Sequence, residues 1–235
     1  MLLATSAEAE KVNVAVAANF TDAAQEIAAA FADVTDHEAV LSFGASGQFY
    51  TQISQGAPFD VFLAADDERP ALAVKEGHGV SGSVFTYAIG QLVLYSADED
   101  RETGPETLAK GEFNRIAISN PDTAPYGAAA VEAMKALNVY DSLQPKIVQG
   151  QSIAQAYQFV QTGNAELGFV ALGQVAQTEG GSRWIVPQDL YTPIRQDAVL
   201  LVRGKDNPAA TAFLDFLKGK QAQAIIQKFG YALYR

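Results

Sequence analysis

The chain has 235 residues, of which 49% are hydrophobic and 18% are charged, and it contains no cysteine. Its 16 basic and 27 acidic side chains give a net charge of −11 with no long run of either sign, which argues against a nucleic-acid or anionic-membrane surface. Without cysteine, thiol catalysis, disulfides and thiolate metal sites are excluded. No apolar stretch approaches the roughly 20 residues that span a bilayer, so no membrane insertion is expected.

The first ten residues differ from the rest of the chain. A short apolar piece leads into the small residues Ala7-Glu8-Ala9, an A-x-A-like pattern. This resembles the end of a secretory signal, although the basic start and most of the apolar centre are missing. Residues 1–10 are therefore expected to be either a signal-peptide remnant or a disordered N-terminus.

From there on, apolar strand-like runs alternate with helical patterns. The predicted strands are 12–17, 40–43, 61–64, 85–95 with a break at Gly90, 116–119, 147–148, 167–171, 184–186 and 198–202. The predicted helices are 21–31, 48–55, 70–76, 127–137, 152–161, 208–217 and 221–229. Strands separated by helices predict an α/β fold with mostly parallel sheets flanked by helices.

Two apolar runs, 88–96 and 194–202, indicate long extended segments that pass between two lobes. Lobe 1 would then comprise 11–87 together with 198–235, and lobe 2 would comprise 88–197. Ligands of open α/β sheets bind at the carboxyl ends of the strands. Two lobes that face each other would place those ends around one cleft.

Four of the predicted strands end in a short loop that opens a helical pattern. The loops are Ala18–Thr21, Gly44–Gly47, Asn120–Gly127 and Gln149–Ser152. None contains Lys or Arg. A helix N-terminus offers unpaired N–H groups and a partial positive charge, so it can hold an anion without charged side chains. Taken singly, Asn19, Ser46 and Ser152 could equally be plain helix caps.

Four segments carry a resemblance to a known family. They are Val14–Thr21 (VAVAANFT), Ser42–Gly47 (SFGASG), Gly56–Asp66 (GAPFDVFLAAD) and Asn120–Gly127 (NPDTAPYG). They resemble the periplasmic molybdate-binding proteins, the solute-binding components of ABC importers, and the likeness extends from about Val12 to Tyr231. It implies a two-lobed type II periplasmic-binding-protein fold and a periplasmic monomer that passes molybdate or tungstate to a membrane permease. No other cofactor and no direct cation ligand are implied.

The resemblance also implies an oxyanion site made of hydroxyl and backbone N–H groups. Asn19 stands where the family has Ser or Asn, and Ser46 matches a serine that gives both its hydroxyl and its N–H. Tyr126 and Ile153 match backbone N–H donors.

One position departs from the family pattern. Some members place a Tyr hydroxyl on the ligand where this chain has Ala171, which cannot donate through its side chain. Two replacements are open: the hydroxyl of Tyr126, or additional N–H groups from Ala18 and Asn19.

The donor set bears on the kind of ligand and on the alternatives. Molybdate, tungstate and sulfate carry no proton at neutral pH, whereas phosphate keeps one and favours a site with a carboxylate. The matched positions hold no Asp or Glu. A sulfate- or other small-anion-binding protein and the ligand-sensing domain of a regulator remain alternatives, the latter disfavoured because little chain is left for a DNA-binding segment. An enzyme is not expected, since only His37 and His78 exist and no nucleophile elbow or phosphate loop is found.

Overall fold

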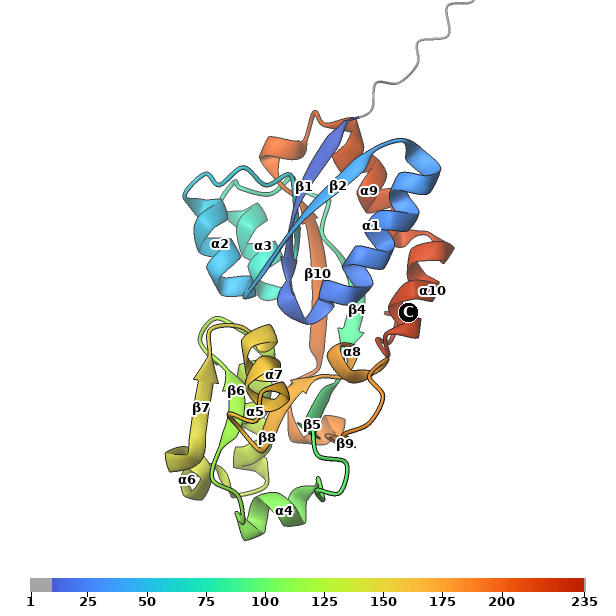
Figure 1. Ribbon diagram of the computed structural model, residues 1–235. Coiled ribbons are helices and arrows are strands. Elements are labelled where there is room, and N and C mark those ends of the chain that lie inside the picture. Colours follow the sequence, from blue (N-terminus) through green and yellow to red (C-terminus); the bar gives the residue numbers. More distant parts are fainter. Residues whose placement is uncertain (1–9, 235) are drawn as a thin grey trace, which may run out of the picture.

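The computed structural model describes residues 10–234, so the expectation for the N-terminal segment falls almost entirely outside the described part. Two lobes follow one another along the long axis of the molecule (Figure 1). Each lobe is built on a five-stranded sheet flanked by helices, as the strand and helix pattern predicted. No helix of residues 10–234 is both long and apolar enough to cross a membrane.

The first lobe contains the N-terminal part of the chain and its C-terminal helices. Its strands are β1 (Lys11–Ala17), β2 (Glu38–Gly44), β3 (Val61–Leu63), β4 (Phe85–Gly90) and β10 (Ile194–Leu200) in the order β2-β1-β3-β10-β4. Its helices are α1 (Thr21–Thr35), α2 (Ser46–Ser54), α3 (Glu68–Lys75), α9 (Pro208–Lys218) and α10 (Lys220–Lys228), with the 3-10 turns η1 (Ala18–Phe20) and η4 (Val202–Gly204). β1 pairs in parallel with β2 and β3, whereas β10 is antiparallel to both β3 and β4. One strand of this sheet, β10, therefore runs against the other four.

The second lobe repeats this plan. Its strands are β5 (Leu92–Ser96), β6 (Ile116–Ser119), β7 (Ile147–Gly150), β8 (Leu167–Ala171) and β9 (Ser182–Ile185) in the order β7-β6-β8-β5-β9. Its helices are α4 (Pro105–Lys110), α5 (Pro125–Ala136), α6 (Tyr140–Leu143), α7 (Ile153–Gln161) and α8 (Leu172–Val175), with the 3-10 turns η2 (Gln144–Lys146) and η3 (Gln188–Leu190). β6 is parallel to β7 and β8, and β5 is antiparallel to β8 and β9. Here β5 is the reversed strand.

Local sequence fixes where the helices nearest the lobe boundary begin. α5 begins at Pro125, a residue suited to the first helical position because its missing N–H would be unpaired there in any case. Gly127 in the same turn lies so close to β6 that a Cβ would come within 2.2 Å of the Ser119 carbonyl oxygen. α7 is capped by Ser152, whose Oγ accepts from the N–H of Gln155.

Each lobe has its own apolar core, and the two cores meet at the boundary. In the first lobe, Phe31 of α1 packs edge-to-face against Phe213 of α9, with ring centroids 5.3 Å apart. The core of the second lobe also includes Ala17, Ala18 and Ala65, which belong to the first lobe. Small residues at these places let the ends of β1 and β3 approach the second lobe closely.

Two strands carry the chain between the lobes. β4 ends at Gly90 and leads directly into β5, and β10 brings the chain back (Figure 1). The C-terminal tail joins this region through a bridge between Ile89 and Ala232. The predicted lobe boundaries at 88 and 198 fall inside these strands, and the division of the chain at those residues stays a prediction.

Asp197 lies at an irregularity of β10, where the pairing with β4 shifts register between Gln196 and Asp197. The residue is 6% exposed, and its Oδ1 has no hydrogen-bond partner among residues 10–234. Burial raises the pKa of Asp197, and the Thr86 side chain and the Arg195 charge oppose this only in part.

We therefore expect Asp197→Asn to stabilise the protein near pH 7. Between the unfolded pKa, about 3.9, and the raised folded pKa, the folded state binds more protons, so the free energy of unfolding falls as pH rises. Urea unfolding at a series of pH values should show the variant above wild type near neutrality and level with it below about pH 3, where both states are protonated. Asp33→Asn, on the exposed side of α1, is the control. A variant no more stable than wild type at pH 7 would contradict the assignment.

Candidate functional site

A small cavity lies between the two lobes. The first lobe lines it with Ala17, Ala18, Asn19, Gly44, Ala45, Ser46 and Ala65, and the second with Ala124, Pro125, Tyr126 and Ile153. Its volume is about 10 Å³, close to the minimum that holds one water molecule. All five predicted site residues (Ala18, Asn19, Ser46, Tyr126 and Ile153) therefore lie together, and their part in binding stays a prediction.

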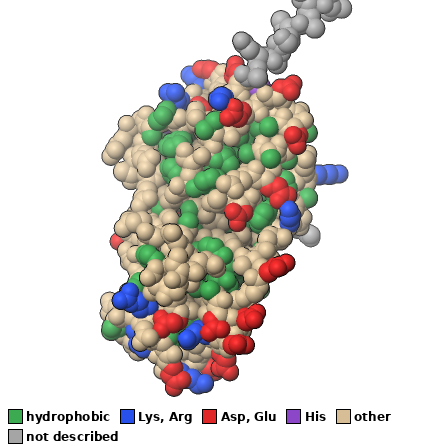
Figure 2. Space-filling view, viewed as in Figure 1, with side chains coloured by type: hydrophobic (Ala, Val, Ile, Leu, Met, Phe, Trp, Pro, Cys, Tyr) green, Lys and Arg blue, Asp and Glu red, His purple; other side chains and the backbone are tan. Residues whose placement is uncertain are grey.

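The described residues that line this cavity are all uncharged. Among the described residues, no Asp, Glu, Lys or Arg contributes to its lining. A neighbouring interlobe groove of about 330 Å³ is different, because Asp66, Asp67, Glu68, Asp122 and Glu132 line it beside Arg69 and Arg195. On the face shown in Figure 2, charged side chains gather mainly at the outer ends of the two lobes. The uncharged cavity thus suits an anion better than the larger groove, where the carboxylates outnumber the arginines.

Ser46 opens α2 at the edge of the cavity and is 1% exposed. Its Oγ accepts a hydrogen bond of 2.9 Å from the N–H of Ala65, the second residue after β3. A serine hydroxyl has one proton and two acceptor sites, so this bond leaves the proton free to be donated. The N–H of Ser46 lies in the first helical turn and has no partner within the helix. Ser46 can therefore donate twice.

Tyr126 and Ile153 bring the first turns of α5 and α7 to the opposite side of the cavity. Their N–H groups also lack partners within their helices, because the first four N–H groups of a helix have no acceptor one turn earlier. Donors from three helix N-termini thus converge on one small space. Each of these helices has at least nine residues.

The hydroxyl of Tyr126, unlike its N–H group, does not face the cavity. It is fully buried and has no well-formed hydrogen bond to any described residue. It lies beside β4, since a Cβ on Gly90 would come within 2.1 Å of it. Burial raises the pKa of Tyr126 well above its ordinary value, so the phenol stays protonated. Gly90 is not part of the cavity lining, so the hydroxyl is directed toward β4 and not into the cavity.

Asn19 lines the cavity from the turn η1, but its side-chain amide is occupied elsewhere. Its Nδ2 donates to Oε1 of Gln196 and to the hydroxyl of Tyr231. Of the two replacements for the missing donor at Ala171, this arrangement favours the N–H groups of Ala18 and Asn19.

Ala171 itself does not line the cavity. Its N–H donates to Oε1 of Gln174, and Nε2 of the same side chain donates to the carbonyl oxygen of Ile153. Gln174 thus fastens the end of β8 to the first turn of α7. This side chain holds the first turn of α7 in place.

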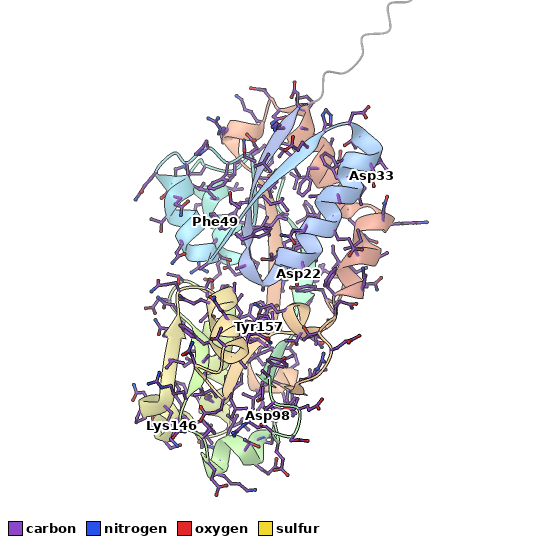
Figure 3. All side chains as sticks on the ribbon, viewed as in Figure 1. Asp22, Asp33, Phe49, Asp98, Lys146 and Tyr157 are labelled. Carbon is purple, nitrogen blue, oxygen red and sulfur yellow. The ribbon has the colours of Figure 1, made fainter. Side chains whose placement is uncertain are left out.

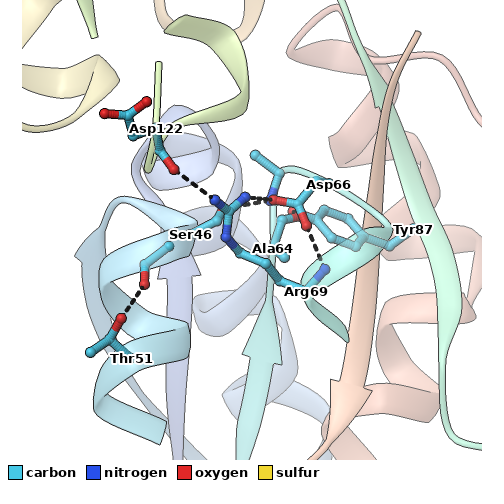
Figure 4. A network of polar contacts seen from close by, with 9 residues as sticks. Ser46, Thr51, Ala64, Asp66, Arg69, Tyr87 and Asp122 are labelled. Carbon is cyan, nitrogen blue, oxygen red and sulfur yellow. Dashed lines mark hydrogen bonds and ion pairs between the residues drawn. The ribbon is translucent and has the colours of Figure 1, made fainter. Parts of the chain in front are cut away.

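Direct contacts beside the cavity join the two lobes. The N–H of Gly47 donates to the carbonyl oxygen of Thr123 at 2.9 Å. The guanidinium of Arg69 pairs with Asp66 in its own lobe and donates across the boundary to the carbonyl oxygen of Asp122 at 3.1 Å (Figure 4).

The two lobes also face each other through α1 and α7. Asp22 on α1 and Tyr157 on α7 lie on opposite sides of the boundary (Figure 3). Together with the contacts of Gly47 and Arg69, this places the first lobe directly against the second. The lobes are therefore closed over the cavity.

Sequence reasoning missed the residues that hold the predicted donors in place. The position of Ala65 could have indicated its role, because it follows a buried strand within the G-A-P-x-D-V-F-L-x-A-D segment. Gln174, Gln196 and Tyr231 carried no such indication, since Gln196 and Tyr231 reach Asn19 over 177 and 212 residues of chain. Only the folded arrangement brings these side chains to the site.

Comparison with known proteins agrees with this architecture. The model of the family described as bacterial extracellular solute-binding protein matches residues 12–232. The molybdate-binding protein ModA of Rhodobacter capsulatus is 57% identical over 98% of this chain and 92% of its own length. ModA of Azotobacter vinelandii is 55% identical over 99% of this chain and 94% of its own length. A solved structure of the periplasmic molybdate-binding protein of A. vinelandii superposes with a TM-score of 0.92 and 40% identity, covering 95% of this chain and all of that one. The chain therefore belongs to the bacterial extracellular solute-binding protein family and, within it, to the periplasmic molybdate-binding proteins.

Proposed function

We propose that this protein binds a tetrahedral oxyanion, molybdate or tungstate, in the interlobe cavity and delivers it to the permease of an ABC importer. The observation that carries the proposal is a cavity lined by three helix N-termini and the Ser46 hydroxyl, with no charged side chain among its described lining. The ModA proteins named above are molybdate-binding by name, which supports the choice of ligand.

The donor set explains how a dianion can be held without a positive side chain. Molybdate accepts hydrogen bonds and donates none, so a lining of N–H and O–H donors is complementary to it. About five hydrogen bonds to a charged ligand at about 1.5–3 kcal/mol each give a gross term of roughly 8–15 kcal/mol. Nanomolar affinity corresponds to about −12 kcal/mol, so the donors must replace most of the ligand's hydration. The function follows from hydrogen bonding and involves no catalytic step.

Closure of the lobes is the mechanism of capture. A cavity of about 10 Å³ lined by both lobes has room for about one water molecule, so a tetrahedral oxyanion enters only when the lobes move apart. The ligand then contacts Ser46 from the first lobe and the first turns of α5 and α7 from the second, which stabilises the closed form by its extra contacts there. The closed monomer in the periplasm would be the form that the permease recognises.

Calorimetric titration of the purified, dialysed protein tests the function directly. We expect one molybdate per chain with high affinity, similar behaviour with tungstate, and no displacement by phosphate, which would bring a proton without an acceptor to receive it. Sulfate binding as tight as molybdate would change the function to general oxyanion uptake. Absence of heat with all four anions, confirmed by equilibrium dialysis, would contradict the oxyanion function.

Ser46→Ala should weaken molybdate binding at least tenfold. The change removes one hydroxyl donor to a charged ligand, worth about 1.5–3 kcal/mol, and also leaves the N–H of Ala65 without its partner. Calorimetry gives the affinity, and urea unfolding of the ligand-free protein shows how much is lost in folding. Ser54→Ala, an exposed serine at the other end of α2, is the matched control. Unchanged affinity in Ser46→Ala would place the site elsewhere.

Gly47→Ala should weaken binding although it removes no donor. A Cβ at this position would come within 2.9 Å of the Thr123 Cα and 3.0 Å of the Arg69 guanidinium, so it would hold the closed lobes apart. Overpacking of this kind costs about 1–3 kcal/mol, which corresponds to a loss of affinity of roughly 5- to 150-fold.

The folding of Gly47→Ala gives an independent readout. Alanine favours a helix over glycine by about 1 kcal/mol, so the ligand-free variant should unfold no more easily than wild type. Gln48→Ala, the next residue of the same helix, should bind like wild type. Wild-type affinity in Gly47→Ala would show that the Gly47–Thr123 contact is not part of the ligand-bound form.

A further inference from the structure

Asn19, in the first loop of the cavity, is held by three hydrogen bonds to residues far along the chain. Its Nδ2 donates to Oε1 of Gln196 at 2.5 Å and to the Tyr231 hydroxyl at 3.2 Å. The Tyr231 hydroxyl in turn donates to the carbonyl oxygen of Asn19 at 2.6 Å. Both the side chain and the main chain of one cavity-lining residue are therefore fixed by two residues that do not line the cavity.

Gln196 occupies an unusual place for a polar side chain. It is fully buried in β10, the strand that returns the chain to the first lobe, and lies next to the shift of register in that strand. An irregularity of this kind re-aims side chains. Its Nε2 has no hydrogen-bond partner among the described residues, and an unpaired buried donor costs free energy. The contact that its polar group does make is the one to Asn19.

Tyr231 reaches the same point from the C-terminal tail. Its ring packs edge-to-face against Phe20, the neighbour of Asn19, with centroids 5.2 Å apart. Burial raises the pKa of Tyr231 well above its ordinary value, so its hydroxyl keeps the proton that it donates to Asn19. The turn η1 is thus held by hydrogen bonds from both β10 and the C-terminal tail.

We infer that Gln196 is a positioning residue for the oxyanion site and acts through Asn19. By holding the Asn19 amide away from the cavity, Gln196 and Tyr231 leave the N–H groups of the first turn, at Ala18 and Asn19, as the donors of this loop. Because Gln196 belongs to the strand between the lobes, the placement of these donors depends on that strand. This inference rests on the proposed function and adds a residue that lies 177 positions from Asn19 in the chain.

The test is a double-mutant cycle measured by molybdate calorimetry. Gln196→Met keeps the length of the side chain but removes the acceptor, and Asn19→Ala removes the group that it holds. We expect Gln196→Met to weaken molybdate binding five- to twentyfold in the wild-type background. In the Asn19→Ala background the same change should weaken it less than twofold, because the partner is already gone.

A purely structural role would give a different result. If Gln196 matters only for packing, its replacement should lower affinity by the same factor in both backgrounds, or lower only the stability of the ligand-free protein in urea. Either outcome overturns the inference, as does wild-type affinity in Gln196→Met. Gln188→Met is the control, since Gln188 also bonds through its side chain, to the carbonyl oxygen of Tyr191, but lies away from the cavity.

A second variant tests the same inference if Gln196→Met does not fold. Should Gln196→Met not fold, Tyr231→Phe removes only the hydroxyl that holds Asn19 from the other side. Its expected effect on molybdate affinity is also a loss. The loss should be smaller in the Asn19→Ala background, where the bond from Nδ2 is gone and the bond to the main-chain carbonyl oxygen remains, and equal losses in both backgrounds overturn the inference. Wild-type protein that binds none of the four anions would overturn the proposed function, and the inference with it. Binding by wild type with no coupling between residues 19 and 196 would overturn the inference alone.

Discussion

Unpaired N–H groups in the first turn of a helix are the physical feature on which this molecule depends. A helix cannot satisfy these donors internally, and water satisfies them when the end is exposed. Here three helix ends and the turn η1 meet at one small cavity, which has room for about one water molecule. An anion that accepts several hydrogen bonds satisfies them together. Lysine and arginine are lacking from the described lining, which is consistent with anion binding at helix N-termini.

Because the donors are divided between the two lobes, the donor set depends on how the lobes meet. Ser46 and η1 belong to one lobe and the first turns of α5 and α7 to the other, so the full set exists only when the lobes meet. Gly47 allows that meeting because it has no side chain to collide with Thr123, and Arg69 adds a hydrogen bond across the boundary. Under the proposed function, contacts to the ligand and contacts between the lobes would stabilise the same closed form.

Residues that do not themselves supply the predicted donors hold the donor groups in place. Ala65 holds the Ser46 hydroxyl, Gln174 holds the first turn of α7, and Gln196 with Tyr231 holds Asn19. Each of these residues forms at least one hydrogen bond to a group at the cavity or its edge. Under the proposed function, such bonds would set the spacing of the donors, and that spacing would distinguish oxyanions of equal charge.

The sequence by itself determined the alternation of strands and helices, the two-lobed α/β fold, and the loops from which Ser46, Tyr126 and Ile153 reach the cavity. It could do so because each of these is a local signal: an apolar run, a small polar loop, and a helical pattern within about a dozen residues. The tertiary structure alone decided that the Asn19 amide turns away from the cavity, that Gly47 touches Thr123, and that Gln196 lies behind the first loop. These features depend on contacts between residues far apart in the chain, and such contacts leave no local pattern to read.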